Sequence, residues 1–182
     1  MAARRPVMKP ARRRAVVITV SDRCSRGEAE DRSGPGAAAG LRAMGFETSE
    51  PLVIPDDRAA IERSIRRLAA SADVVLLTGG TGLGPRDVTP EAVEAVVDRL
   101  IPGVGEALRA AGASATPLAA LSRSLAGQLG RAIVVALPGS PGGVADGLAV
   151  LGKLLPHAIH IIGGGTHEHR HVGAHGLRRK KT

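Results

Sequence analysis

A glycine-rich loop of sequence TGGTG occupies residues 78–82, directly after a short apolar run. Glycine lets the backbone approach an anion closely, and backbone N–H groups can then cradle phosphate oxygens, with the hydroxyls of Thr78 and Thr81 as further donors. No Gly-Lys-Ser/Thr follows, so this is not a Walker A loop, and Pro85 stands at the third glycine position of the dinucleotide fingerprint. Taken alone, the loop is consistent with either a phosphate site or a tight turn.

Three aspartates, Asp56, Asp57 and Asp87, could bring metal chemistry to such a loop. Two carboxylates beside phosphates are the usual way in which a protein holds Mg²⁺, because this ion keeps several waters and bridges phosphate oxygens. The alternative is that Asp56 or Asp57 caps the helix that follows, and that Asp87 pairs with Arg86 or caps the next helix. The residues alone favour the capping roles.

The segments that must position these groups alternate between strands and helices. Continuously apolar runs predict buried strands, and apolar residues at helical spacing, with caps such as Ser33 and stops such as Gly45, predict helices. Strands are expected at 15–20, 46–54, 73–78 and 132–137, and helices at 33–44, after Asp56 or Asp57, from Thr89 as a cap, and at 106–111, 143–151 and 153–161. Residues 112–130 are expected to be irregular apart from a short helix near Ala119. This pattern predicts an α/β protein, a three-layer α/β/α single domain with a mostly parallel central sheet.

All four expected strands end in polar or glycine-rich sequence. In open α/β sheets the ligand site lies beyond the carboxyl ends of the strands, which the fold brings together. A single loop of this kind would mean little, whereas four of them indicate a site. The loops are Ser21-Asp22 and residues 55–57, 78–82 and 137–141.

The chain has 182 residues and a formal net charge of +8, which suggests nucleic acid as a partner. Residues 1–14 hold six Lys or Arg and residues 170–182 hold five, with no acid in either segment, whereas residues 15–169 hold 14 basic and 17 acidic residues. The net charge of the body is therefore −3. We expect flexible, solubilising tails at 1–14 and 166–182 around a domain at 15–165, with nucleic-acid binding through the tails as the less favoured alternative.

Composition excludes several other classes of protein. Phe46 is the only Phe, Tyr or Trp, which argues against base stacking on single-stranded nucleic acid. A single cysteine, Cys24, rules out an intrachain disulfide and a four-cysteine zinc site. No run of about 20 apolar residues is present, so we expect no membrane span and a cytoplasmic protein. The histidines at 167, 169, 171 and 175 resemble a metal-binding tract, for which adventitious affinity is the simpler interpretation.

Seven short motifs, in order along the chain, resemble those of a known family. The glycine loop belongs to a longer motif, TGGTGLGPRDVTPE at 78–91, and LPGSP occupies 137–141. The others are TVSDR at 19–23, DRSGP at 31–35, PD at 55–56, PGVGE at 102–106 and LSR at 121–123. Over residues 15–165 the chain is similar to the MogA/MoaB family of molybdenum cofactor biosynthesis proteins, whose fold is an α/β fold of the predicted kind.

The resemblance implies a molybdopterin adenylyltransferase, which transfers AMP from ATP to the terminal phosphate of molybdopterin with Mg²⁺ and releases pyrophosphate. Such a transfer needs two aligned polyanions and neutralised charge more than covalent help from the protein. By its motifs, the resemblance implies that Asp56 and Asp87 are the catalytic and metal-binding residues, which reverses the preference for capping. It implies that the substrate-binding residues are Ser21, Asp22, Thr78, Gly79, Gly80, Thr81, Gly82, Gly139 and Ser140.

The chain departs from the family pattern at one position. Many members carry a lysine just after the Pro-Gly-Ser-Pro turn, where this chain has Gly142 and Gly143. Arg86, Arg123 and Lys153 are the candidate replacements for that cation. Some members of the MoaB branch bind molybdopterin without transferring AMP, which is the alternative function. The family further implies a homotrimer or hexamer and a downstream molybdate-inserting protein as a partner.

Overall fold

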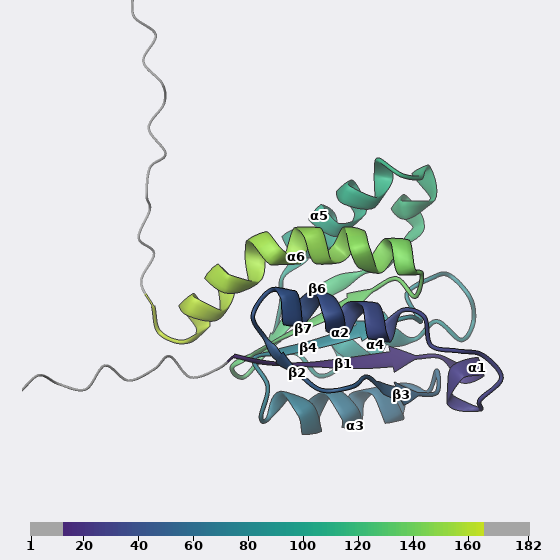
Figure 1. Ribbon diagram of the computed structural model, residues 1–182, viewed down its shortest axis with the longest axis horizontal. Helices are drawn as coiled ribbons and strands as arrows, with labels where there is room; N and C mark the ends of the chain where they lie inside the picture. Colours follow the sequence, from purple (N-terminus) through teal and green to yellow (C-terminus); the bar gives the residue numbers. More distant parts are fainter. Residues whose placement is uncertain (1–12, 166–182) are drawn as a thin grey trace, which may run out of the picture.

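The computed structural model describes residues 13–165, and Figure 1 shows a sheet covered by helices on both faces. The C-terminal tail expected at 166–182, with its histidines, and residues 1–12 of the N-terminal tail lie outside the described residues. The remaining two residues of the N-terminal segment are described, and Arg14 is already the first residue of a strand.

Seven strands form one sheet in which parallel pairing predominates. The order across the sheet is β2-β1-β4-β7-β6-β5, and β3 pairs with the later part of β1. Strands β2, β3 and β4 run parallel to β1, and β7 runs parallel to β4, whereas β6 is antiparallel to both β7 and β5. The strands are β1 (Arg14–Val20), β2 (Glu47–Thr48), β3 (Leu52–Ile54), β4 (Val74–Thr78), β5 (Arg99–Leu100), β6 (Leu125–Leu129) and β7 (Ala132–Leu137).

Six α-helices and one 3₁₀ helix, η1, occur in the described part of the chain. They are α1 (Asp22–Ser25), α2 (Gly34–Ala43), α3 (Arg58–Ala69), α4 (Thr89–Glu94), α5 (Pro102–Ala113), η1 (Pro117–Leu121) and α6 (Pro141–Ile162). The two helices expected at 143–151 and 153–161 are the single helix α6, because its apolar stripe continues past Gly152 and a glycine inside a helix costs only about 1 kcal/mol. Helix α5 begins at Pro102 rather than at 106, and Thr89 is the first residue of α4 rather than its cap, which is Val88.

The centre of the sheet is apolar on both faces because helices cover both. Every residue of β4 and β7 is buried, as expected for parallel strands enclosed by helices. Leu76 belongs to one core cluster with Leu41 of α2 and Leu151 of α6, whereas its neighbour Leu77 belongs to a second cluster with Ile61 of α3. Figure 1 shows α2 and α6 on one side of the sheet and α3 on the other. The predicted three-layer α/β/α fold with a mostly parallel sheet is confirmed.

Two expectations about strands are wrong. Residues 112–130 were expected to be irregular apart from a short helix, but they contain β6 as well as η1. The sequence of β6, LAGQL, has no β-branched residue, and the strand is held by tertiary contacts: it pairs with β7, and Val97 leaves no room for a side chain at Gly127. The single strand expected at 46–54 is divided into β2 and β3 around Pro51, which has no N–H for a ladder.

Helix α6 is the one described helix that is long and apolar enough to cross a membrane, by length and composition only. Its most apolar window has a mean hydropathy of 1.2, and 22% of that window is buried. Core helices of globular domains pass the same test, and the buried positions of α6 recur along one face, so this is weak evidence for a span. Those positions are Val144, Gly147, Leu151, Leu155 and Ile159.

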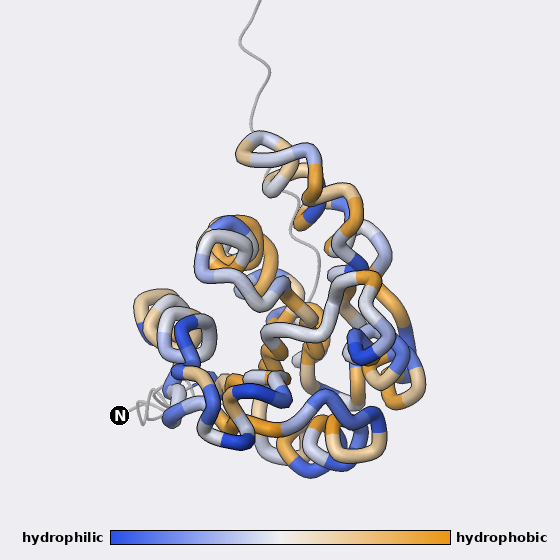
Figure 2. Tube along the Cα trace, turned by 90° about the vertical axis from the view of Figure 1, so that its right-hand side faces the viewer, coloured by the Kyte–Doolittle hydropathy of each residue, from blue (hydrophilic) through white to orange (hydrophobic). Residues whose placement is uncertain are grey.

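Figure 2 shows hydrophobic residues gathered toward the inside of the molecule.

Candidate functional site

The C-terminal ends of β3, β1, β4 and β7 lie side by side at one edge of the sheet. Thr78, the last residue of β4, pairs with Leu137, the last residue of β7. Hydrogen bonds just beyond the strands continue this alignment: the Ser21 N–H donates to the Ile54 carbonyl at 2.9 Å, and the Gly79 N–H donates to the Leu137 carbonyl at 3.1 Å. The four loops that follow these strands therefore begin next to one another.

Gly79 and Gly139 lie close together where two of these loops meet. Gly79 has a φ of +99°, and a Cβ there would collide with the carbonyl oxygen of Val20. A Cβ at Gly139 would lie 3.1 Å from the Cα of Gly79. The buried hydroxyl of Thr78 donates to the Pro138 carbonyl at 2.9 Å. Thr78, expected to bind substrate, therefore ties the two loops together through its hydroxyl.

Asp22 and Asp56 bind each other's backbone across the ends of β1 and β3. The Asp22 N–H donates to Asp56 Oδ2 at 2.7 Å, and the Asp56 N–H donates to Asp22 Oδ1 at 3.1 Å. Asp22 also accepts two hydrogen bonds from Arg86, whose Nε and Nη2 lie 3.0 and 3.1 Å from its carboxylate oxygens. Within the described residues this leaves Asp56 Oδ1 as the oxygen of the pair that accepts no hydrogen bond.

The pKa values of these two carboxyl groups shift in opposite directions. Burial raises the pKa of Asp56 above its ordinary value, and the nearby charges of Asp22 and Asp87 raise it further, against the lowering effect of the Asp22 N–H. For Asp22, burial also acts to raise the pKa, but the hydrogen bonds from the Asp56 backbone and from Arg86 outweigh it, and the pKa is lowered. Asp56 is therefore a carboxylate with like charges nearby. A divalent cation bound there would stabilise its ionised form.

Asp87 and Asp56 both lie against the glycine loop. The Gly84 N–H donates to Asp87 Oδ2 at 2.8 Å, and a Cβ at Gly82 would lie 2.8 Å from the same oxygen. A Cβ at Gly80 would lie 3.1 Å from Asp56 Oδ1. The absence of side chains at Gly80 and Gly82 thus lets both carboxylates approach the loop backbone closely.

The oxygen atoms at this loop fit a hard divalent cation. Within the described residues Asp56 Oδ1 and Asp87 Oδ1 accept no hydrogen bond, and Thr89 Oγ1 is buried beside Gly80 without a partner. Mg²⁺ usually takes one or two carboxylates, with waters and substrate phosphates completing its shell. Residues 13–165 contain no group of three or more His, Cys, Asp or Glu that could hold a metal. An ion at Asp56 and Asp87 would therefore need phosphate oxygens or waters as further ligands.

Arg123 holds the loop that carries Asp87. Its backbone N–H donates to the Thr81 carbonyl at 2.9 Å, and its Nε donates to the Gly82 carbonyl at 2.8 Å. Its two Nη atoms donate to the Asp87 carbonyl and to the carboxylate of Glu91. The guanidinium considered as a phosphate partner is thus committed to the protein itself.

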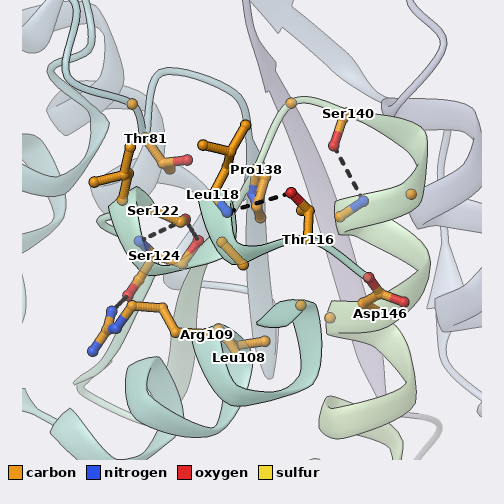
Figure 3. A pocket seen from close by; sticks show the side chains of 18 of the residues that line it. Thr81, Leu108, Arg109, Thr116, Leu118, Ser122, Ser124, Pro138, Ser140 and Asp146 are labelled. Carbon is orange, nitrogen blue, oxygen red and sulfur yellow. Dashed lines mark hydrogen bonds between the residues drawn. The ribbon is translucent and has the colours of Figure 1, made fainter. Parts of the chain in front are cut away.

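The glycine loop and the turn at residues 138–140 open onto a cavity of about 740 Å³ (Figure 3). Its other walls come from α5, from the segment around η1 and from the start of α6. Ligand pockets usually measure about 300–1,000 Å³, so the volume suits a ligand of several rings. The predicted site residues on its wall are Gly79, Gly80, Thr81, Gly82, Asp87, Gly139 and Ser140.

The remaining predicted residues do not line this cavity; they are Ser21, Asp22, Asp56 and Thr78. Ser21 and Thr78 line a second hollow of about 280 Å³, which shares Gly79 and Gly139 with the larger one. Ser21 also caps α1 by accepting the Cys24 N–H at 3.2 Å. Ser21 and Thr78 are thus in a compartment that meets the large cavity at the glycine pair, whereas Asp22 and Asp56 line neither of these two hollows.

Several polar residues that were not among the predicted site residues also line the large cavity. Arg109 comes from α5, Thr116 and Ser122 flank η1, and Asp146 comes from α6 (Figure 3). Arg109 Nη1 donates to the Ser124 carbonyl at 2.9 Å, which connects α5 to the start of β6. Ser122 belongs to the LSR motif at 121–123, whereas Arg109, Thr116 and Asp146 belong to none of the seven motifs. The η1 segment was expected to be largely irregular. Asp146 could have been found from its spacing, because it follows the Pro-Gly-Ser-Pro turn within the predicted helix.

The site combines a glycine-lined backbone, two carboxylates and a cavity beyond the ends of parallel strands. This arrangement is that of an α/β domain with its ligand site at the strand ends. A family model described as "Probable molybdopterin binding domain" matches residues 16–157. The chain belongs to this family of molybdenum cofactor biosynthesis proteins, which confirms the resemblance stated from its motifs.

Two curated relatives illustrate the range of the family. The chain is 46% identical over 154 residues to a molybdenum cofactor biosynthesis bifunctional protein of Synechococcus elongatus, a match that covers 84% of this chain and 48% of the relative. It is 34% identical over 150 residues to a molybdopterin adenylyltransferase of Helicobacter pylori, covering 80% of this chain and 85% of the relative. The chain thus spans about half of the first protein and most of the second.

Solved structures of both branches of the family are similar to this chain. A structure of MogA superposes with a TM-score of 0.79 at 41% identity and covers 82% of this chain and 99% of its own. A structure of the molybdopterin biosynthesis enzyme MoaB from Thermus thermophilus superposes with a TM-score of 0.77 at 40% identity and covers 83% of this chain and 96% of its own. Overall similarity therefore does not separate the two branches.

Proposed function

We propose that this protein transfers AMP from ATP to the terminal phosphate of molybdopterin, with Mg²⁺, and releases pyrophosphate. The observation that carries the proposal is the approach of two carboxylates, Asp56 and Asp87, to one glycine-lined loop that opens onto a cavity of about 740 Å³. The similarity to a relative named molybdopterin adenylyltransferase supports it.

The proposed reaction breaks one phosphoanhydride bond and forms another. An oxygen of the molybdopterin phosphate bonds to the α-phosphorus of ATP, and the β- and γ-phosphates leave as pyrophosphate with the electron pair of the broken bond. No protein nucleophile is needed, so the protein contributes alignment and charge stabilisation. Backbone N–H groups of Gly80–Gly82 and of Gly139–Ser140 would hold the phosphate groups, since the Gly79 N–H is already bound to the Leu137 carbonyl.

Asp56 and Asp87 would hold the Mg²⁺ ion, which neutralises phosphate charge when bound. The raised pKa of Asp56 agrees with this role, because the like charges of Asp22 and Asp87 oppose its ionised form. The pair between Asp22 and Arg86 then fixes the position of the Asp56 backbone, since Asp22 Oδ1 accepts the Asp56 N–H.

Arg86 is the cation best placed to replace the lysine of other family members. Lys153 lies thirteen residues beyond Ser140 on α6, about 20 Å along the helix axis, and Arg123 is committed to the glycine loop. The side chain of Arg86 is 66% exposed and pairs with Asp22 at 2.9 Å. To contact a phosphate of the substrate, this guanidinium would have to release Asp22.

Purified protein incubated with molybdopterin, ATP and Mg²⁺ should form adenylylated molybdopterin and pyrophosphate. The variant Asp87→Asn should lower the rate by about 100-fold or more, because it removes a charge that stabilises the transferring phosphate through the metal. Asp98→Asn is a matched control, since Asp98 accepts the Gly130 N–H in the turn between β6 and β7, at the other end of the central strands. Equal rates for Asp87→Asn and the wild type would contradict the proposed role.

Gly142 favours a second candidate function, binding of molybdopterin without transfer. Nothing lies within 4 Å of the position that a Cβ would take at Gly142, so no side chain fills this space. If the wild type binds molybdopterin but forms no adenylylated product with ATP and Mg²⁺, the binding function replaces the transferase. In that case Gly142→Lys, which restores the family's cation in open space, should gain activity.

We also propose, on the family's pattern, that the chain assembles as a homotrimer or hexamer in the cytoplasm. Its product would pass to a molybdate-inserting protein, and nucleic acid is not a favoured partner. Sedimentation of the purified chain measures the assembly directly.

A further inference from the structure

The large cavity contains a carboxylate that the proposed transfer does not use. Asp146 lies in the second turn of α6, is half-buried and lines the cavity. Figure 3 shows it on the side of α6 that faces Thr116 and α5. Among residues 13–165 it has no hydrogen-bond or ion-pair partner. Half-buried carboxylates normally have hydrogen-bond partners, so the lack of one here is unusual. Both oxygens of Asp146 can accept hydrogen bonds from a ligand.

The walls near Asp146 are largely apolar. Leu108 of α5 and Leu118 and Ala119 of η1 line the same cavity. Small residues keep it open: Gly112 faces Ala119 with no room for a Cβ, and Gly147 faces the sheet in the same way. Apolar walls with a few polar groups suit a flat heterocycle that is oriented by hydrogen bonds.

Asp146 is separated from the end of the cavity that suits anions. Ser140 caps α6 by accepting the Gly143 N–H at 3.2 Å, and it lies at the turn beside the glycine loop. Asp146 comes six residues later, about 9 Å along the helix axis. A ligand whose phosphate lies at the loop would reach Asp146 with its far end if it is two or three fused rings long.

We propose that Asp146 binds the pyrimidine edge of a pterin ring and thereby selects 2-amino-4-oxopteridines, an inference that rests on the proposed function. That edge presents two adjacent N–H donors, one from the ring nitrogen and one from the 2-amino group, which match the two oxygens of a carboxylate. Adenine presents a donor beside an acceptor, which an amide satisfies better. Lumazine, the 2,4-dioxo analogue, presents an acceptor in place of the amino group and leaves one carboxylate oxygen facing another oxygen.

A carboxylate can also accept hydrogen bonds from the ribose hydroxyls of a nucleotide. The apolar walls contributed by Leu108 and Leu118 favour a ring over a sugar at this end of the cavity. The ribose is therefore the competing ligand group that the experiment must distinguish.

The experiment compares two phosphorylated probes, pterin-6-ylmethyl phosphate and its lumazine counterpart. The chain has no Trp or Tyr, so ligand fluorescence can be followed in the full-length protein without interference. The wild type should bind the pterin probe about 10–100-fold more tightly than the lumazine probe, the range expected for a charge-assisted hydrogen bond. Asp146→Asn should abolish this preference and leave ATP binding unchanged. Glu106→Gln, an exposed acid-to-amide change on α5, is the matched control and should behave as the wild type.

Each other outcome has a distinct meaning. A wild type that binds both probes equally, or an Asp146→Asn variant that keeps the pterin preference, overturns this inference and leaves the proposed function intact. Weaker ATP binding by Asp146→Asn with an unchanged pterin preference assigns the residue to the ribose and also overturns it. A wild type that binds neither probe nor molybdopterin contradicts the proposed function itself. The wild-type comparison of the two probes tests the selectivity even if the variant fails to fold.

Discussion

Asp56 is the residue at which stability and function conflict most directly. Burial and the charges of Asp22 and Asp87 raise its pKa in the folded protein. A carboxyl group whose pKa is raised by folding destabilises the fold while it is ionised, and this penalty disappears as the pH falls through its folded-state pKa. A cation bound at neutral pH would relieve the same penalty.

We predict that Asp56→Asn raises the Tm by on the order of 1 °C at neutral pH and abolishes Mg²⁺-dependent transfer. Asparagine keeps the size of the side chain and can still accept the Asp22 N–H, but it removes the unfavourable charge. The difference in Tm from the wild type should shrink as the pH falls, because the wild-type carboxyl then becomes protonated. Thermal unfolding across a pH series measures both effects.

Asp57→Asn is the control for this prediction. Asp57 is exposed and caps α3 by accepting the Ala60 N–H at 2.7 Å, a bond that asparagine can retain. It should leave both the Tm and the activity close to those of the wild type. A lower Tm for Asp56→Asn would contradict the charge penalty, and full activity would show that the charge of Asp56 plays no part in binding a cation.

The residue types at the strand ends could be predicted from the sequence, but their pairing could not. The motifs place Asp56 and Asp87 after strands that meet at one sheet edge, and the structure brings both to the glycine loop. Asp22 is held by Arg86, 64 positions away, and this contact depends on how the loop after β4 folds back, which no local pattern records. Asp146 was missed because its importance arises only when α5 and η1 pack opposite α6.

At the scale of elements, the loop between β4 and α4 has little regular structure of its own and depends on Arg123 for its position. One guanidinium contacts the carbonyls of Gly82 and Asp87 and the carboxylate of Glu91. Arginine suits this arrangement because its planar fork presents several donors in fixed directions, whereas lysine presents a single ammonium group. The loop conformation, and with it the Asp87 carboxylate, therefore depends on a residue from the segment before β6.

We predict that Arg123→Lys retains an ion pair with Glu91 but loses the two carbonyl contacts, lowering the free energy of unfolding by about 1–3 kcal/mol. It should also weaken Mg²⁺-dependent ATP binding, because Asp87 is no longer held in place. Denaturant unfolding and ATP titration with and without Mg²⁺ measure these changes. Arg58→Lys is the control, since Arg58 forms an exposed pair with Glu62 within one helix and should change stability by less than about 0.5 kcal/mol. A similar effect of both variants would contradict the special role of Arg123.

The elements that could be predicted are those that are buried on both faces along their whole length. Strands β4 and β7 are buried on both faces, so their apolar runs identify them without further information. Strand β6 could not be predicted in the same way, because its LAGQL sequence gains its extended form from pairing with β7. Helix α6 was divided at Gly152 because the local penalty for glycine was visible in the sequence, while the packing of Leu151 and Leu155 that overrides it was not.

At the scale of the whole molecule, the net charge comes from residues outside the described range. Residues 13–165 hold 16 Lys and Arg and 16 Asp and Glu, so the described fold is formally neutral. The net charge of +8 therefore comes entirely from residues 1–12 and 166–182. The attraction of a polyanion by this net charge would therefore depend on residues 1–12 and 166–182.

We predict that a chain trimmed to residues 13–165 keeps its Tm and its transfer activity but loses affinity for heparin and for duplex DNA. In the full chain, that affinity should fall steeply with salt and should be similar for the two polyanions, because contacts with phosphate or sulfate groups release counterions without reading a sequence. Removing only residues 166–182, which hold five of the nine outer basic residues, should reduce the salt dependence by about half. Binding assays over a range of salt concentrations measure these slopes. Salt-dependent binding by the trimmed chain would instead locate a basic surface on residues 13–165. A clear preference of the full chain for one DNA sequence would restore nucleic acid as a specific partner.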